Sequence, residues 1–175
     1  MHLIKRILAG CWIACAPFAA AGTPELHELG RHVPGFEFPG EGGFAIADFD
    51  GDGLDDLVVP ARSGTAMFQV YGMRDGAMVA KQAVFVPDRR LVRVLAAEVA
   101  GVAQLVTVSN EGVVRRFAGW PLTEVQTLEL GGEVMAAAVG DVDGDGELDL
   151  VTSTDWSQCA LRAHVLATGA PRWRS

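Results

Sequence analysis

Cysteine is scarce in this sequence: there are three in 175 residues, and two of them, Cys11 and Cys15, lie near the N-terminus. If that segment is removed on export, Cys159 is left alone and cannot form an internal disulfide. The count therefore excludes both a disulfide-stapled scaffold and a metal site built from thiolates. For Cys159 we predict a small, buried apolar side chain rather than a nucleophile.

The sequence also lacks the patterns that carry common enzyme chemistry. No Ser lies in a nucleophile elbow, no Gly-rich phosphate loop leads from a strand into a helix, and His27, His32 and His164 do not have the spacing of metal ligands. No window has the periodicity of an amphipathic helix of ordinary length. We therefore predict a protein that is not an enzyme and that is built from strands.

The N-terminus has the pattern of an export signal. A basic pair precedes a short apolar run at residues 7–18 and a small-residue cleavage site at residues 19–21. The run is too short to predict a membrane span. We predict a signal peptide at residues 1–21 and a secreted or periplasmic protein. The alternative is a lipid anchor at Cys11, because residues 8–11 resemble a bacterial lipobox.

Acidic residues exceed basic ones, 22 against 14, and give a formal net charge of −8. Half of the chain is hydrophobic, which is enough for one domain with a real core. Ten of the acidic residues fall in two short segments, residues 48–56 and 141–149. Such clustering favours a cation site over a general solubility charge, and it argues against a nucleic-acid partner because phosphates would be repelled.

These two segments, called here the first and second acidic loops, share one pattern. Each has carboxylates at positions 1, 3, 5 and 9 and glycine at position 6, which is Gly53 in the first loop and Gly146 in the second. Glycine tolerates the positive φ that a sharp turn needs. The pattern is not an EF-hand, because Val59 and Thr152 stand where that motif has a bidentate Glu.

Clustered carboxylates of this kind repel one another unless a cation lies between them, and Ca²⁺ takes ~6–8 oxygen ligands. We predict one Ca²⁺ ion in each loop, with Mg²⁺ and plain solvated acidic turns as the alternatives. The predicted ligands of the first loop are the side chains of Asp48, Asp50, Asp52 and Asp56 and the carbonyl of Leu54. Those of the second loop are the side chains of Asp141, Asp143, Asp145 and Asp149 and the carbonyl of Glu147.

The loops belong to a unit that occurs three times. The corresponding loop positions begin at Asp48, Glu98 and Asp141, which are 50 and 43 residues apart. Each unit has four short β-branched and apolar runs bounded by Gly, Asp and Asn, an arrangement typical of propeller blades. The fold class we predict is all-β, a partial β-propeller of three four-stranded antiparallel blades. The predicted order is an extended lead-in at 22–43 and blades near 44–90, 91–132 and 133–175.

Residues 44–57 and 138–150 resemble the FG-GAP/VCBS repeat family, and the resemblance extends from Gly43 to about Thr168. It implies an exported protein with structural Ca²⁺ ions that hold the blade loops, while activity lies elsewhere. The middle copy, at residues 98–103, lacks the aspartates, so no metal is predicted there.

Three units do not reach the ~4–8 blades of a closed propeller. The chain is then a fragment of a longer protein, closes by self-association, or stays an open arc. We predict a non-catalytic module that binds an unknown protein or glycan or serves as a scaffold. The alternative is part of a polysaccharide-degrading or quinoprotein-like enzyme, because Thr168 to Trp173 resembles the Thr-Gly-x-x-x-Trp ending of quinoprotein blades. For Trp173 we favour packing between blades.

Overall fold

The computed structural model describes residues 42–60, 67–88, 90–154 and 160–174. Within these ranges all regular secondary structure is β-strand. Twelve strands in these ranges form three four-stranded sheets, and all strand pairs are antiparallel. The three cysteines, His27, His32, the predicted export signal and nearly all of the lead-in lie outside the described residues.

Each sheet is a meander whose strands follow one another in chain order. The first sheet contains β1 (Ala45–Ala47), β2 (Asp56–Pro60), β3 (Met67–Arg74) and β4 (Ala77–Phe85). The second contains β5 (Leu91–Val99), β6 (Val102–Ser109), β7 (Val113–Ala118) and β8 (Thr123–Glu129). The third contains β9 (Ala136–Gly140), β10 (Asp149–Ser153), β11 (Leu161–Val165) and β12 (Pro171–Arg174).

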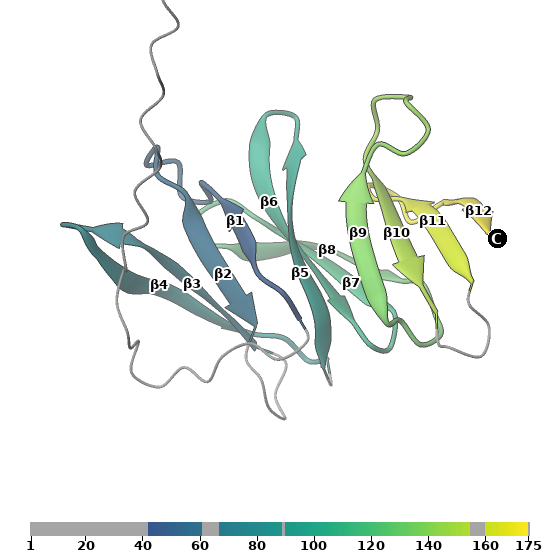
Figure 1. Ribbon diagram of the computed structural model, residues 1–175, viewed down its shortest axis with the longest axis horizontal. Coiled ribbons are helices and arrows are strands. Elements are labelled where there is room, and N and C mark those ends of the chain that lie inside the picture. The colour runs from purple at the N-terminus through teal and green to yellow at the C-terminus, as the bar shows by residue number, and fades with distance from the viewer. Residues whose placement is uncertain (1–41, 61–66, 89, 155–159, 175) are drawn as a thin grey trace, which may run out of the picture.

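The three sheets stand side by side in chain order as blades (Figure 1). Their first strands are neighbours, since β1 contacts β5 and β5 contacts β9. A meander in each unit, with the first strands gathered together, is the arrangement of propeller blades around a common axis. The chain is therefore an all-β, three-bladed partial propeller, as the sequence predicted.

The core consists of two apolar layers, one on each side of the middle sheet. Between the first and second sheets, Phe68 meets Phe117 edge to face, with ring centroids 5.0 Å apart, and Val58, Val70 and Leu105 pack around them. Between the second and third sheets, the layer includes Val106, Val114 and Leu150. Successive side chains of a strand point to opposite faces, so the middle sheet supplies apolar residues to both layers.

The middle sheet has a much tighter hairpin than the sequence predicted at residues 98–103. Glu98 pairs with Ala103 and Val99 with Val102, so that β5 and β6 extend through most of the predicted loop. Only Ala100 and Gly101 remain as the turn, with φ values of 52° and 76°. Positive φ at both central residues is the geometry of a two-residue type I′ hairpin.

The fourth strand of every blade carries a β-bulge against the third strand. In the first sheet the register passes from Val70–Gln82 to Tyr71–Ala80 and leaves Lys81 unpaired. The same step leaves Val125 unpaired in the second sheet and Arg172 in the third. A bulge re-aims the side chain of the extra residue. Lys81, Val125 and Arg172 therefore occupy corresponding places in the three blades.

Candidate metal centres in the two acidic loops

Both acidic loops join the first strand of a blade to the second. The first loop lies between β1 and β2, and the pair Ala47–Asp56 closes it. The second lies between β9 and β10, and the pair Gly140–Asp149 closes it. Because the two closing pairs correspond, the two loops start from the same backbone geometry.

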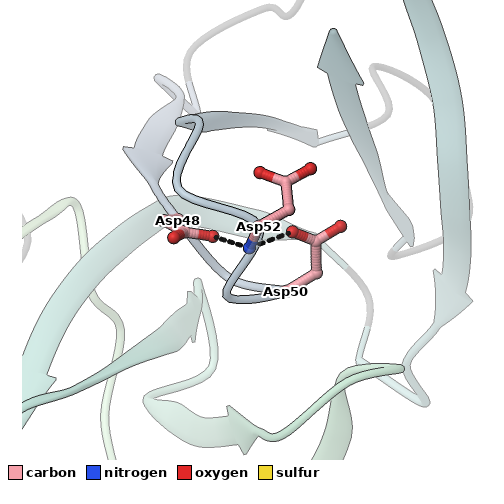
Figure 2. Close-up of side chains that lie close together, drawn as sticks. All are labelled: Asp48, Asp50 and Asp52. Carbon is pink, nitrogen blue, oxygen red and sulfur yellow. Dashed lines mark hydrogen bonds between the residues drawn. The ribbon is translucent and has the colours of Figure 1, made fainter. Parts of the chain in front are cut away.

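The first acidic loop curls around the carboxylate at its first position. Asp48 accepts hydrogen bonds from the backbone N–H groups of Gly51 at 2.7 Å, Gly53 at 2.9 Å and Asp52 at 3.2 Å. The Asp52 N–H also points to Asp50 Oδ1, at 3.2 Å, and Figure 2 shows this backbone nitrogen between Asp48 and Asp50. The backbone thus directs its donors at the acidic side chains and partly offsets their mutual repulsion.

The second acidic loop repeats these contacts. Asp141 accepts from the N–H groups of Gly144 at 2.7 Å and Gly146 at 3.0 Å, and Asp145 accepts from Glu147 at 2.8 Å. Gly146 has a φ of 86°, the same value as Gly53 in the first loop. That conformation is costly for any residue with a Cβ, which explains glycine at this position of both loops.

Three carboxylates converge in each loop, although the sequence predicted four. In the first loop these are Asp48, Asp50 and Asp52, each of which offers an oxygen within 4.8 Å of the others. In the second loop they are Asp141, Asp143 and Asp149. The predicted ligands Asp56 and Asp145 lie outside these two clusters. An ion with ligands at ~2.3–2.6 Å has opposed ligand oxygens about 5 Å apart, so clusters of this size fit a divalent ion.

The ninth-position carboxylates are buried under the loops. Asp56 is 1% exposed and Asp149 is fully buried. Asp56 accepts the N–H of Phe49 at 3.2 Å, and Asp149 accepts the N–H of Val142 at the same distance. Burial raises the pKa of the Asp56 carboxyl, and the neighbouring ammonium of Lys81 offsets part of that rise. These two residues join each loop to the second strand of its blade.

A lysine that no sequence motif marks reaches into the first loop. Lys81 Nζ lies 2.6 Å from Asp50 Oδ2, 2.7 Å from Asp56 Oδ1 and 3.1 Å from Asp52 Oδ2. Its side chain is only 14% exposed. Partial burial alone would lower the pKa of Lys81, but the three carboxylates outweigh burial and raise it above the ordinary value.

An arginine takes the same place in the second loop. Arg172 Nε lies 3.1 Å from Asp149 Oδ1, and Nη1 lies 3.4 Å from Asp143 Oδ2. Its Nη2 lies 3.1 Å from Glu147 Oε2 and also donates to Asp145. The pKa of Asp145 is lowered, first by the backbone N–H of Glu147 and then by Arg172. For Glu147 only the backbone carbonyl was predicted to bind an ion, but its side-chain carboxylate forms a salt bridge with Arg172.

These contacts change the expected charge balance of the loops. The acidic clusters were expected to need a divalent ion to offset their charge. The protein supplies a cation of its own to each loop, from the fourth strand of the same blade. No local signal in the sequence marks Lys81 or Arg172 as partners of the loops, because the pairing depends on the bulge in β4 and β12. One hint was present, since Lys5 and Lys81 are the only lysines.

Glycine and tryptophan residues fit around the lysine of the first loop. A Cβ on Gly72 would lie 2.1 Å from Lys81 Cε and 2.6 Å from Asp56 Oδ1, so only glycine on β3 leaves room for this salt bridge. The ring of Trp120, from the turn between β7 and β8, has its centroid 6.0 Å from Lys81 Nζ. That distance is at the outer limit of a cation–π contact.

The other predicted functional positions are not gathered into a site in the described part of the chain. His164 lies half-buried in β11, and Trp173 in β12 is 43% exposed. A crevice of about 230 Å³ between the second and third sheets borders the second loop at Glu147 and is lined also by Glu98 and Arg116. The guanidinium of Arg116 is engaged by Gln104 and Gln126, so this crevice offers no free cation for a substrate.

Comparison with known proteins gives a similarity of fold alone. No protein-family model matches the sequence, and no curated protein matches it. Among solved structures, BamB from Moraxella catarrhalis is similar at 20% identity and a TM-score of 0.46, over 77% of this chain and 36% of that one. The chain thus spans about a third of the BamB chain. The blade arrangement is established by the sheets of this chain, independently of that similarity.

The described ranges contain no helix long and apolar enough to cross a membrane.

Proposed function

We propose that this chain is an exported, calcium-binding β-propeller module without catalytic activity of its own, of the FG-GAP/VCBS type. The observation that carries the proposal is a cluster of three carboxylates in the corresponding loop of two blades, Asp48–Asp50–Asp52 and Asp141–Asp143–Asp149, which share the first and third loop positions. A bound Ca²⁺ ion would supply a double positive charge among these oxygens. The chain's own residues shape the loop, through the backbone donors that hold Asp48 and Asp141.

The role we propose for such ions is structural. Each loop closes on a buried aspartate of the second strand, so a cation that fixes the loop also fixes the start of β2 or β10. The module would then present a stable surface to a protein or glycan partner, or serve as a scaffold within a larger protein. Export rests on the N-terminal sequence pattern, with a lipid anchor at Cys11 as the alternative.

We propose further that the outer face of the third sheet packs on another blade. Residues of the first sheet that are buried against the second have exposed counterparts there. Ala45 is 4% exposed and Val58 is fully buried, whereas the corresponding Ala138 is exposed and Val151 is half-buried. The covering blade would belong to a longer chain or to a second copy.

Calorimetric titration with Ca²⁺ tests the metal-binding proposal. The wild-type chain is expected to bind two ions, and a variant with Asp50→Ala and Asp52→Ala is expected to bind one, because the second loop is intact. Ca²⁺ should also raise the melting temperature and a chelator should lower it, since an ion that binds only the native state stabilises that state. A variant that still binds two Ca²⁺ ions, or a wild-type melting temperature that chelator does not change, would contradict the proposal.

A further inference from the structure

The same loop positions meet a basic side chain in both acidic loops. Lys81 contacts Asp50, Asp52 and Asp56, the third, fifth and ninth positions of the first loop. In the second loop, Arg172 contacts the third, fifth and ninth positions, which are Asp143, Asp145 and Asp149, and Glu147 as well. Both basic residues project from the same bulge of the fourth strand. Two chemically different cations therefore occupy the same place in two blades.

The middle blade provides an internal comparison. Its fourth strand has the same bulge, but the residue there is Val125, which is 55% exposed. Its first hairpin is the short turn at Ala100 and Gly101, without the clustered acids. The bulge therefore does not itself require a basic residue. The described chain has a cation at this position only where an acidic loop faces it.

A divalent ion and the internal cation would share the same carboxylates. Asp50 and Asp52 belong to the convergent cluster of the first loop, and each lies within 3.1 Å of Lys81 Nζ. An ion bound to either oxygen of those carboxylates at ~2.3–2.6 Å would lie within a few ångströms of the ammonium. Like charges at that distance repel strongly in the partly buried loop. Occupation by one cation should therefore exclude the other.

We propose that Lys81 and Arg172 are resident counter-cations of the two loops, and that a divalent ion enters each loop only by displacing them. This inference rests on the proposed function of the loops as ion sites. In the metal-free protein the basic side chains keep the clustered carboxylates together. When the ion enters, the side chain swings out and exposes its charge to solvent. Arg172 holds four carboxylates and Lys81 holds three, so the first loop should load before the second.

Calorimetric Ca²⁺ titrations of the full chain test the exchange. Lys81→Met should tighten binding at one site by about tenfold or more, because the ion no longer displaces a cation. Arg172→Met should do the same at the other site. Val125→Met places the same side chain at the corresponding bulge of the middle blade and should leave both affinities unchanged. Lys81→Arg retains the charge and should bind Ca²⁺ with an affinity close to that of the wild type.

Melting temperatures give a second readout. In chelator, Lys81→Met should melt below the wild type, and Ca²⁺ should raise its melting temperature by more than it raises that of the wild type. If Lys81→Met is unfolded in chelator, recovery of the fold on addition of Ca²⁺ supports the exchange, and failure to recover contradicts it. Crystals of the calcium-loaded wild type should show Lys81 Nζ withdrawn from Asp50.

The failures of the two proposals are distinguishable. Equal Ca²⁺ affinity in the wild type and in both methionine variants would overturn the exchange while leaving the loops as ion sites. Absence of Ca²⁺ binding in the wild type and in every variant would remove the ion sites and the exchange together. Binding that appears only in Lys81→Met and Arg172→Met would show that the resident cations control access to the loops.

Discussion

The two buried aspartates, Asp56 and Asp149, connect the acidic loops to the strands that follow them. Each accepts a backbone N–H from the residue after the first loop position and also faces a basic side chain. Removal of such a carboxylate leaves a buried backbone donor unpaired and takes one carboxylate away from the basic side chain. Changes of this kind typically cost about 3 kcal/mol or more.

We expect Asp56→Ala to lower the free energy of unfolding by about 3 kcal/mol in chelator, measured by urea denaturation. Asp55→Ala is the matched control, because Asp55 is exposed and adjacent in the same loop; it should change stability by about 0.5 kcal/mol or less. Equal effects of the two substitutions would show that Asp56 does not close the loop.

His164 supplies a pH dependence separate from the loops. Burial, with a smaller effect of the neighbouring positive charge of Arg162, lowers the pKa of His164. Its Nδ1 is buried and makes no hydrogen bond within the described structure. Because the unfolded chain then binds the proton more readily, stability should be greatest above about pH 6.5 and fall as the pH drops from there to the folded-state pKa.

His164→Leu removes this titration and should flatten the dependence of the melting temperature on pH between about pH 7.5 and pH 5. The measurement is made in chelator, so that proton competition with metal does not contribute. The carboxylates titrate mainly below that window and affect both proteins. A wild-type curve as flat as that of the variant would argue against a neutral His164 with a buried Nδ1.

At the scale of elements, the bulged fourth strands also join one blade to the next. Gln82 follows the bulge residue of β4, and its side chain bonds both backbone groups of Leu122, at 2.8 Å to N and 2.9 Å to O. Gln126 follows the bulge residue of β8 and donates to the carbonyl of Ala167 at 2.6 Å. Each glutamine thus holds the turn between the third and fourth strands of the following blade.

We expect Gln82→Ala to lower the free energy of unfolding by about 1–3 kcal/mol, since it leaves two backbone groups of Leu122 without their partner. Thr123→Ala is the control: Thr123 donates to the Ala118 carbonyl at 3.3 Å within the same turn, but not between sheets. Hydrogen exchange should become faster at the Leu122 amide in the first variant and not in the second. Equal protection of the Leu122 amide in the two variants would contradict a stabilising contact of Gln82 between blades.

At the scale of the whole molecule, the third sheet ends the described arc with an apolar outer face. Trp173 in β12 is 43% exposed. It pairs with Ala163 of β11, so the two side chains lie on the same face of the sheet. Trp173 directly follows the bulge residue, where the first two blades have the glutamines that hold the next blade. The position that joins blades elsewhere in the chain therefore carries a large apolar side chain here.

We expect the protein to self-associate through this face, as measured by sedimentation velocity over a range of concentrations. Trp173→Glu should shift the distribution toward the monomer, because it places a charge in the apolar contact. Val125→Glu adds the same charge on the outer strand of the middle blade and should have no effect. A wild-type protein that stays monomeric at every concentration would contradict self-association.

The fold followed from the sequence because its signals are local. Short apolar runs bounded by Gly, Asp and Asn predicted the strands, and the repeated Asp-x-Asp-x-Asp-Gly pattern predicted where each acidic loop lies. Glycine at Gly53 and Gly146 follows from the positive φ of one loop position. The hairpin of the middle blade is shorter than the predicted loop at residues 98–103, because pairing of Glu98 with Ala103 extends β5 and β6. The sequence alone did not predict how far that pairing continues.

The sequence by itself determined the number of blades and the places of the two acidic loops, since each depends on residues close in the chain. Only the tertiary structure decided which cation faces those aspartates. Lys81 and Arg172 lie more than twenty residues beyond their loops. A bulge in the fourth strand re-aims each side chain toward the loop of its blade. The charge balance of the loops is therefore a property of the assembled sheet.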